Sequence, residues 1–474
     1  MPYAKTGGLA DMVGALLRSL RLAGNDVLAF MPLYPVVRRE HTDLAQMARL
    51  QEIPLSLGGA EYAFSVYTTT LDRTDIPIYF IDCPAMFDRP VLYTTDADEH
   101  RRFLLFTRAA LESCRRLGLA PDIFHCNDWH TAFAPLYLKT LFASDAPFAK
   151  AKSVLTIHNI GFQGMMPSSA VGDLELGLAW TQLDQADLTR GVINSLKTGI
   201  KYADRVTTVS PTYAREICDA PAGMGLESAL RARTDRVVGI LNGVDYEVWD
   251  PRHDPYLATH FGVQNLSGKA VNKDLLTKAV GLTLPPNLPL IGMVSRLTVQ
   301  KGIDLLFEAL PLLLQTRDFG LVVLGSGDKQ YEDFFTDLAK AFPGRVAYRA
   351  GYDESMAHLI EAGSDLFLMP SQYEPCGLNQ MYSLRYGTIP VVRNTGGLAD
   401  SVQHFDPSSG AGTGCVFNDF DAPAVTWAVN TALDWYGNSG MWRVLMQNAM
   451  AKDFSWEAQA AQYVSLYKGL AGRT

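Results

Sequence analysis

Residues 290–307 read LIGMVSRLTVQKGIDLLF: a continuous apolar run, a polar loop, and an apolar pattern with helical spacing. An apolar run without alternation is typical of a strand buried on both faces, as in parallel sheets covered by helices. The loop, residues 295–302, would follow the carboxyl end of that strand, where open α/β sheets bind ligands. The stretch therefore predicts a doubly wound α/β domain with a ligand site at this loop.

Similar apolar runs recur along the chain, with amphipathic stretches between them. They span residues 26–31, 76–81, 153–157 and 205–209 in the first half, and 320–324, 365–369 and 388–392 in the second. Between the two series lies a weaker stretch, residues 242–289, which contains the turn-forming sequences DPRHDP and LPPN. The sequence therefore predicts two doubly wound domains, residues 1–240 and residues 241–454.

Composition narrows the class of protein. The chain has 474 residues, 48% of them hydrophobic and 19% charged, with a net charge of −9. This balance is globular and argues against a general nucleic-acid binder, which needs a basic face. The sequence contains no uninterrupted apolar stretch of about 18 residues, so no membrane-spanning helix is predicted. Residues 1–5 contain no apolar core of a secretion signal. Six scattered cysteines without a Cys-x-x-Cys pair indicate free thiols in the cytoplasm.

One hexapeptide, TGGLAD, occurs at residues 6–11 and again at residues 395–400. Each copy precedes a helix-like pattern. Adjacent glycines allow close approach of a ligand, and a helix N-terminus offers free N–H groups and a partial positive charge. A tight turn explains a single copy equally well, but two copies in opposite halves favour a site lined by both domains.

In the second half, Arg296 and Lys301 lie in the loop after the 290–294 run and suit a diphosphate, although a pair of solvated loop cations is the plain alternative. Glu374 follows the 365–369 run and suits sugar hydroxyls or a developing oxocarbenium charge; alternatively it is an idle first-turn acid. Gly325 belongs to a second glycine-rich turn, which alone is a weak signal. Cys376 has no adjacent histidine base, so a packing or binding role is favoured over a reactive thiol.

In the first half, residues 124–131 (FHCNDWHT) place an acid and an indole at a predicted strand end. Trp129 suits stacking on a sugar face, and Asp128 suits binding hydroxyls or accepting a proton. His158 directly follows the 153–157 run, a position at the ligand edge of a sheet that favours function over a structural histidine.

Two patterns resemble metal sites weakly. His125 and His130 lack the further Cys/His set that zinc requires. Asp96 and Asp98 have the acidic spacing that some glycosyltransferases use for a divalent ion, but no clear strand precedes them. The sequence therefore predicts no metal site.

Taken together, the motifs resemble the bacterial glycogen synthases and plant starch synthases. The matching segments are residues 5–9, 125–130, 156–159, 241–245, 295–302, 374–378 and 395–398. The resemblance runs end to end and implies two Rossmann-like domains facing a cleft (the GT-B fold), with a C-terminal helix, residues 455–474, crossing back to the first domain. It also implies transfer of glucose from ADP-glucose to the non-reducing end of an α-1,4-glucan, with retention and without metal or another cofactor.

The resemblance further implies individual roles. Arg296 and Lys301 would bind the donor diphosphate, Glu374 the donor glucose, and His158 its hydroxymethyl group; with Asp128 these form the predicted catalytic set. The acceptor would meet Tyr93, Asp128 and Trp129. The remaining donor-binding residues would be Lys5, Gly7, Gly8, Asn159, Asn242, Gly325, Tyr352, Cys376, Gly377, Leu378, Thr395, Gly396 and Gly397.

Family members usually carry a strand before the Lys-Thr-Gly-Gly motif, whereas here Lys5 lies at the start of the sequence. We expect that the sequence starts late and that neighbouring strand edges are exposed. The alternatives are a retaining enzyme with another donor or acceptor, a phosphorylase, for which no pyridoxal phosphate lysine segment is found, and a non-catalytic glucan-binding relative. The choice between ADP- and UDP-glucose and the oligomeric state stay open.

Overall fold

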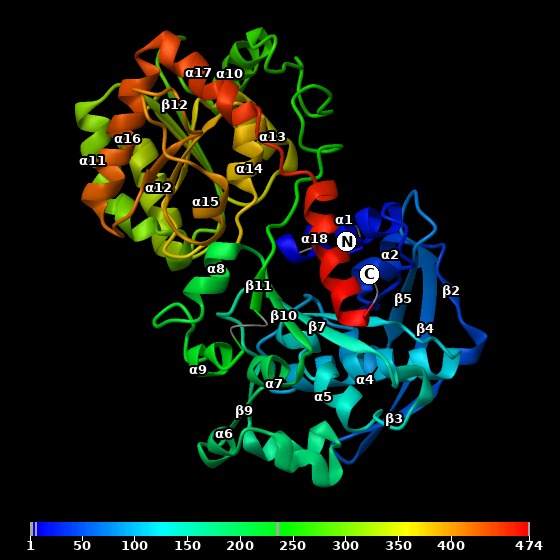
Figure 1. Cartoon of the computed structure of the whole chain (residues 1–474). Coiled ribbons are helices and arrows are strands. Elements are labelled where there is room, and N and C mark those ends of the chain that lie inside the picture. The colour runs from blue at the N-terminus through cyan, green and yellow to red at the C-terminus, as the bar shows by residue number, and fades with distance from the viewer. Residues whose placement is uncertain (1–2, 5–6, 234–236, 473–474) are drawn as a thin grey trace. The chain divides into compact units, whose positions relative to one another are not determined.

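The computed structural model describes residues 3–4, 7–233 and 237–472. Contacts divide the chain into two compact α/β units (Figure 1). The first holds Met1–Val209, Ala214–Gly243 and Trp456–Thr474, and the second holds Ser210–Tyr213 and Val244–Ser455. The two-unit α/β organisation is as predicted, and the predicted boundary between residues 240 and 241 lies close to Gly243.

The second unit contains one sheet of six parallel strands, in the order β14-β13-β12-β15-β16-β17. The strands are β12 (Leu290–Val294), β13 (Gly320–Leu324), β14 (Val346–Arg349), β15 (Leu366–Met369), β16 (Ile389–Arg393) and β17 (Cys415–Phe417). Every residue of β13 and β15 is buried, as the unbroken apolar runs predict. All four runs predicted in this half are strands, whereas β14 and β17 were not predicted.

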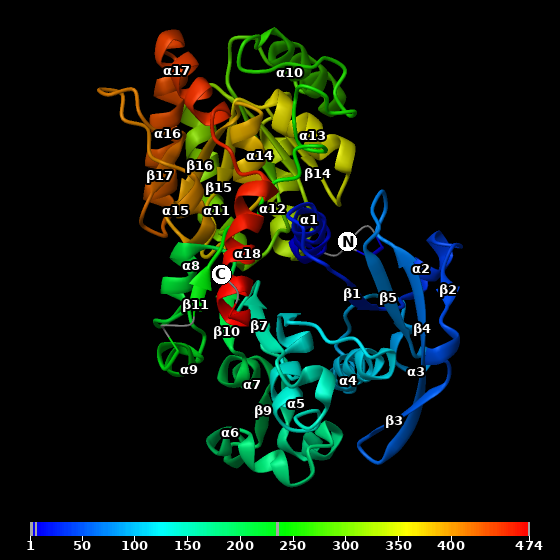
Figure 2. The same cartoon turned by 45° about the vertical axis from the view of Figure 1, so that its right-hand side comes forward.

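Helices lie on both sides of this sheet (Figures 1 and 2). They are α10 (Ser267–Val280), α11 (Ile303–Thr316), α12 (Lys329–Ala341), α13 (Glu354–Gly363), α14 (Asn379–Arg385), α15 (Gly396–Ser401), α16 (Ala422–Tyr436) and α17 (Ser439–Met450). The 3-10 turn η7 (Val299–Lys301) leads from the 295–302 loop into α11, and α8 (Pro211–Glu216) has residues in both units.

The strands of the first unit form three sheets. A mixed sheet has the order β1-β5-β4-β2, with β3 added to β4, and a parallel sheet has the order β11-β10-β7-β6; β8 and β9 pair separately. The strands are β1 (Ala29–Pro32), β2 (Ala45–Gln46), β3 (Ile53–Leu57), β4 (Ala60–Thr70), β5 (Pro77–Asp82), β6 (Ile123–Asn127), β7 (Lys152–Ile157), β8 (Met165–Pro167), β9 (Val192–Asn194), β10 (Arg205–Thr208) and β11 (Val237–Gly239).

The four apolar runs predicted in this half overlap β1, β5, β7 and β10, although β1 begins only at Ala29. The antiparallel hairpin of β3 and β4 was not predicted, because β3 alternates between buried and less buried residues and β4 has only three consecutive buried residues, so neither forms a long apolar run. Its turn is Gly58-Gly59, both with positive φ (58° and 77°), the geometry of a two-residue hairpin turn.

The helices of the first unit include the C-terminal one. They are α1 (Gly8–Leu22), α2 (Pro35–Glu40), α3 (Pro84–Phe87), α4 (Glu99–Leu117), α5 (Ala134–Lys139), α6 (Gln185–Thr189), α7 (Ser195–Tyr202), α9 (Glu227–Arg231) and α18 (Trp456–Ala471). Met12 and Leu16 of α1 share a buried cluster with Trp456 and Tyr463 of α18, which confirms the predicted return of the C-terminal helix to the first unit. In the described part of the chain, no helix is long and apolar enough to cross a membrane.

A buried ion cluster fastens the segment after residue 244 to α14 within the second unit. The Asp250 side chain is fully buried and accepts hydrogen bonds from Arg252 (2.6 Å) and from Arg385 of α14 (2.5 Å). Nearby, Trp249 stacks on Tyr382 of α14 with ring centroids 4.0 Å apart. Burial alone would raise the pKa of Asp250, but the hydrogen bonds from Arg252 and Arg385 outweigh it and lower this pKa to about 2.

We expect Asp250→Asn to lower the free energy of unfolding at pH 7 by about 3 kcal/mol, since two guanidinium groups lose a buried carboxylate. A depressed folded-state pKa contributes stability above the unfolded value of about 3.9, and this contribution is lost as pH falls towards 2. The difference from the unsubstituted protein should therefore shrink in acid. Urea titrations at pH 7 and pH 3 measure it; Asp274→Asn, at an exposed pair with Lys278, should change little. Equal effects of the two substitutions would contradict the assignment.

Candidate active site

The loops after β12 and β15 form the walls of one cavity in the second unit. The two strands are neighbours in the sheet, so their carboxyl ends meet. The cavity measures about 170 Å³. Among its lining residues are five predicted ones, Arg296, Lys301, Glu374, Gly377 and Leu378, together with Ser371 and Asn379.

A buried carboxylate and an ammonium group are joined at this cavity. Lys301 Nζ lies 2.5 Å from Glu374 Oε2, and the Ser371 hydroxyl donates to the same oxygen at 3.0 Å. Glu374 is only 5% exposed, so its charge depends on these partners. Arg296 is exposed at the rim. Two cations and one oriented carboxylate therefore border a space that suits an anionic group next to a hydroxylated one.

Backbone packing holds the two loops together. Gln372 N donates to the carbonyl of Gln300 at 2.9 Å. Gly302 has φ +70°, and a Cβ there would lie 2.0 Å from the carbonyl oxygen of Pro370. Only glycine fits this approach, because it combines the left-handed conformation with the absence of a side chain. Lys301 is consequently held beside the β15 loop.

Two of the glycines predicted to bind donor, Gly397 and Gly325, pack against protein backbone. Gly397 N donates to the carbonyl of Glu374 at 3.0 Å, and a Cβ on Gly397 would lie 1.9 Å from the Cys376 carbonyl oxygen. The Gly397 N–H is therefore bonded within the protein, and the glycine lets α15 pack on the segment that carries Glu374. The role of this helix start in donor binding stays a prediction. Likewise, Gly325 faces the Ser295 carbonyl, where a Cβ would lie 2.0 Å away.

The remaining second-unit residues lie outside the cavity lining. Thr395 precedes α15 and is buried, as are Gly396 and Cys376. Tyr352 is 65% exposed, and its hydroxyl donates to Glu354. Both TGGLAD copies begin helices, as predicted, since α1 starts at Gly8 and α15 at Gly396.

In the first unit, Asp128 and His158 form a second constellation at the ends of β6 and β7. Asp128 has φ +53°, uncommon for a residue with a side chain, and its carboxylate accepts the backbone N–H of His158 at 2.7 Å. Burial raises the pKa of Asp128 to about 7. Burial lowers the pKa of His158 to about 4, so this ring is neutral at pH 7, and its Nε2 donates to Asn127 Oδ1 at 2.9 Å.

The aromatic residues predicted for the acceptor lie close together. The Tyr93 and Trp129 rings both contact His130, with centroids 4.9 and 4.2 Å from it. Tyr93 is 41% exposed. Burial lowers the pKa of His130 to about 3, which leaves this ring uncharged between two aromatic neighbours.

The other residues of the first unit that were predicted to bind the donor are Lys5, Gly7, Gly8, Asn159 and Asn242. Gly7 and Gly8 are exposed at the start of α1, and Asn159 Oδ1 accepts the N–H of Gly161 at 2.9 Å. The side-chain oxygen of Asn242 is buried and has no hydrogen-bond partner among the described residues. Lys5 lies outside the described residues.

The weak metal patterns are occupied by protein partners. Arg89 bonds Asp96 at 2.7 Å and Asp98 at 2.6 Å. His125 Nδ1 accepts the Tyr467 hydroxyl of α18 at 2.7 Å, so this histidine anchors the C-terminal helix. Within the described ranges, no group of three or more His, Cys, Asp or Glu side chains is placed to hold a metal ion.

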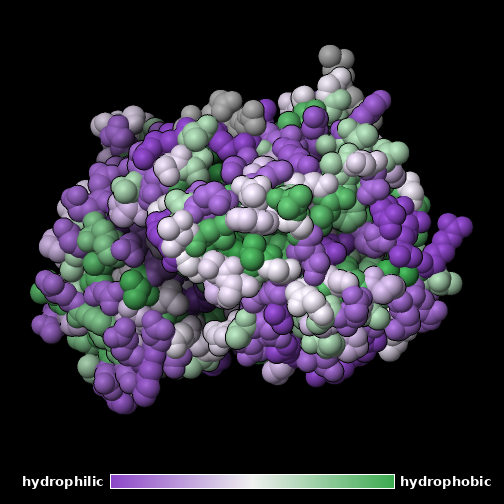
Figure 3. Space-filling view, turned by 90° about the horizontal axis from the view of Figure 1, so that it is seen from below, coloured by the Kyte–Doolittle hydropathy of each residue, from purple (hydrophilic) through white to green (hydrophobic). Residues whose placement is uncertain are grey.

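A groove of about 580 Å³ lies beside Trp129 in the first unit. Residues 96–100 contribute to one wall and residues 161–167 to another. Figure 3 looks onto the first unit from the side of α6, and apolar atoms gather there in a band. Exposed apolar side chains of the neighbouring segment include Phe162, Met165 and Leu178.

Three residues that support the site, Ser371, Asn379 and Asn127, were not predicted as site residues. Ser371 bonds Glu374, Asn379 donates to the Val294 carbonyl at 2.7 Å, and Asn127 holds His158. Each lies within a few residues of a predicted site residue, at or after the carboxyl end of a strand. Polar residues at that edge of a sheet are the sequence signal that could have identified them.

The chain is similar to proteins of known family over nearly its whole length. The family model described as the starch synthase catalytic domain matches residues 1–232, and the model for glycosyl transferases group 1 matches residues 278–439. The glycogen synthase of Koribacter versatilis is 44% identical over 472 residues, covering 99% of this chain and 96% of the relative. That of Anaeromyxobacter dehalogenans is also 44% identical, covering 99% and 97%. The catalytic domain of starch synthase IV from Arabidopsis thaliana, solved with ADP and acarbose, is 35% identical with a TM-score of 0.90, covering 100% and 97%.

Proposed function

The chain belongs to the family of bacterial glycogen synthases and starch synthases, glycosyltransferases of the GT-B fold, and we propose that it transfers glucose from ADP-glucose to the non-reducing end of an α-1,4-glucan with retention of configuration. The observation that carries the proposal is the joined Lys301–Glu374 pair, which borders the same cavity as Arg296. The ADP and acarbose bound by the starch synthase IV structure support the choice of donor and acceptor.

The chemical step requires stabilisation of a departing nucleoside diphosphate. Lys301 and Arg296 would neutralise the charge that develops on the phosphate oxygens as the bond to glucose breaks. Glu374 is held by Ser371 and Lys301, so its carboxylate is oriented before substrate binds. It would bind donor glucose hydroxyls and favour positive charge at the reacting carbon.

The first unit would supply the acceptor side. Asp128 directly precedes Trp129 and is buried. A carboxyl with a pKa of about 7 is suited to binding or deprotonating a hydroxyl near neutral pH. Neutral His158 would offer Nδ1 as an acceptor to a glucose hydroxyl, since its Nε2 is committed to Asn127. We place the enzyme in the cytoplasm, because its six cysteines are scattered along the sequence without a Cys-x-x-Cys pair, as is usual for a reducing compartment.

Purified protein incubated with glycogen and labelled ADP-glucose tests the function. Label should enter glycogen and be released by an exo-acting hydrolase specific for α-1,4 linkages at non-reducing ends. UDP-glucose in a parallel reaction tests donor choice. Transfer to a small molecule but not to glycogen would favour another retaining enzyme of this fold, and glycogen binding without transfer would favour a non-catalytic relative.

We propose that the reaction uses no metal, because fixed cations border the cavity and both carboxylates of the Asp96–Asp98 pair are already bonded to Arg89. Excess EDTA should leave the initial rate within about 20% of the untreated rate, as no charge-neutralising ion is removed. Strong inhibition that Mg²⁺ or Mn²⁺ reverses would contradict this proposal and make the acidic pair a candidate ligand set.

A further inference from the structure

The backbone beside Glu374 is held by a segment from a distant part of the sequence. The Glu374 carbonyl accepts the N–H of Gly397 at 3.0 Å, and the next carbonyl, that of Pro375, accepts the hydroxyl of Ser210 at 2.7 Å. Gly397 belongs to α15, whereas Ser210 lies 165 residues before Pro375 and is fully buried. A buried hydroxyl is therefore fixed to the residue that directly follows Glu374.

Pro375 leaves this segment few other conformations. Its ring fixes its own φ, and a residue that precedes proline is restricted to extended backbone. The carbonyl of Cys376 accepts Nε2 of Gln380 at 3.0 Å, so the peptide groups on both sides of Cys376 are bonded. The position of the Glu374 side chain at the cavity consequently depends on the backbone that follows it, as well as on the partners of its carboxylate.

The segment that contains Ser210 also reaches α15. Asp400 of this helix accepts both the backbone N–H and the hydroxyl of Thr212, each at 2.7 Å. Asp400 is the last residue of the second TGGLAD copy, and Gly397 of the same copy bonds the Glu374 carbonyl. Residues 210–213 therefore bind both the loop that carries Glu374 and the helix that packs against this loop.

The hydroxyl of Ser210 has its direction set by a second hydrogen bond. Residues Ser210–Tyr213 belong to the second unit, although the residues before and after them belong to the first. Ser210 Oγ accepts the backbone N–H of Tyr213 at 3.1 Å, so its proton is left to donate to Pro375. Without the hydroxyl, a buried carbonyl would lose this donor and its peptide group would gain freedom to turn.

We propose that Ser210, Thr212 and Asp400 are positioning residues for glucosyl transfer, because they fix the backbone from which Glu374 reaches the cavity. None of the three is among the described residues that line this cavity, so they act through Glu374. The inference rests on the proposed function. It implies that disturbing these contacts lowers kcat more than nucleotide binding, because the cations proposed for the diphosphate lie on a different loop, the one after β12.

Ser210→Ala is expected to lower kcat for transfer to glycogen about tenfold, while the Kd for ADP changes less than twofold, since a small misplacement of a reacting group costs rate without loss of binding. Titration calorimetry with ADP gives this Kd and also the binding-competent fraction, to which kcat is normalised. Ser113→Ala is the matched control and should leave kcat unchanged. Its hydroxyl is equally buried and donates at 2.7 Å to a backbone carbonyl, that of Ala109 within α4.

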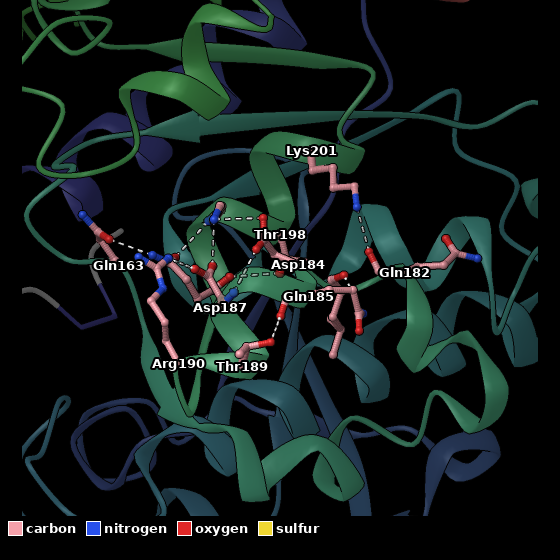
Figure 4. Close-up of polar contacts among 12 residues, drawn as sticks. Gln163, Gln182, Asp184, Gln185, Asp187, Thr189, Arg190, Thr198 and Lys201 are labelled. Atoms are coloured by element: carbon pink, nitrogen blue, oxygen red, sulfur yellow. Dashed lines mark hydrogen bonds and ion pairs between the residues drawn. The ribbon is translucent and has the colours of Figure 1, made fainter.

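A pair of substitutions at Thr212 tests the contact with Asp400 at a less buried position. Thr212→Val should lower normalised kcat about fivefold, whereas Thr212→Ser keeps the hydroxyl and should stay within twofold of wild type. Thr198→Val is the control for loss of a threonine hydroxyl and should have no effect. Thr198 belongs to the first-unit network of Figure 4 and bonds the Asn194 carbonyl at 2.9 Å. If Ser210→Ala yields no protein that binds ADP, the two Thr212 variants decide.

A double substitution separates positioning from general damage. In a Glu374→Ala background, Ser210→Ala should cause no further loss of rate, because the carboxylate that it positions is absent. A further tenfold loss in that background would contradict the inference. If wild type transfers glucose to glycogen but Ser210→Ala and Thr212→Val keep normalised kcat within twofold of it, the inference is overturned and the proposed function stands. If wild type transfers no glucose to any glucan, the proposed function falls, and the inference with it.

Discussion

Lys301→Ala is expected to lower kcat for glucosyl transfer about 100- to 1,000-fold. Lys301 is one of two cations on the cavity, and removing a fixed group that stabilises charge developing in the transition state has effects of that size. Initial rates at saturating ADP-glucose and glycogen measure the change. Because charge on a leaving group develops as the bond breaks, the loss should appear in kcat more than in the KM for the donor.

The substitution also leaves the buried Glu374 carboxylate with only the Ser371 hydroxyl, of these two partners, on its Oε2 atom. The free energy of unfolding must therefore be measured in parallel. Lys301→Arg keeps the positive charge at this position and should retain more activity than Lys301→Ala if charge is the requirement. Lys329→Ala is the control: this lysine is 85% exposed and pairs with Asp333 within α12. Turnover of folded Lys301→Ala within threefold of wild type would remove Lys301 from the reaction.

The second unit was more predictable than the first for a physical reason. Strands such as β13 are buried on both faces and leave unbroken apolar runs in the sequence. In the β3–β4 hairpin, by contrast, β3 and the start of β4 have residues of higher and lower exposure in alternation, so no long apolar run marks either strand. The available signal was Gly58-Gly59 between two alternating segments, which is typical of a two-residue hairpin turn.

The composition of the candidate site was predictable, whereas its internal contacts were not. Residues that follow neighbouring parallel strands must meet at one sheet edge, so Arg296 and Glu374 could be placed together. The 2.5 Å contact of Lys301 with Glu374 depends on side-chain conformations that no local pattern encodes. The packing of Trp129 on Gly164 joins two distant segments and left no periodic signal.

The helix starts show that a correct local prediction does not by itself settle a functional one. Gly-Gly before a helix does mark both helix N-termini. A free N–H at such a position also requires that no protein carbonyl reaches it, and at Gly397 the carbonyl of Glu374 does. This hydrogen bond joins α15 to the segment that carries Glu374, so the sequence of α15 alone could not reveal it.

Asp128→Asn is expected to lower kcat at least about 100-fold and yet to stabilise the fold in alkaline solution. Burial raises the pKa of Asp128 to about 7, whereas in the unfolded chain it is about 3.9. A carboxyl with a raised folded-state pKa contributes stability that is complete below pH 4 and is lost as pH rises through 7. Asparagine has the same shape, can accept the His158 N–H, and never ionises, so it avoids that loss.

The difference in Tm between Asp128→Asn and wild type should therefore grow in favour of the variant from pH 5 to pH 8. Over the same range wild-type kcat should rise as the carboxylate forms, while the variant rate stays low and flat. Asp26→Asn, whose carboxylate is fully exposed, should match wild type in both measurements. Equal Tm differences at pH 5 and pH 8 would contradict the raised pKa of Asp128, and a variant that keeps the wild-type pH profile of kcat would remove Asp128 from the transfer. A gain in stability with a loss of turnover would instead mean that the buried charge and the φ of +53° are kept at the expense of the fold because the reaction needs that carboxylate.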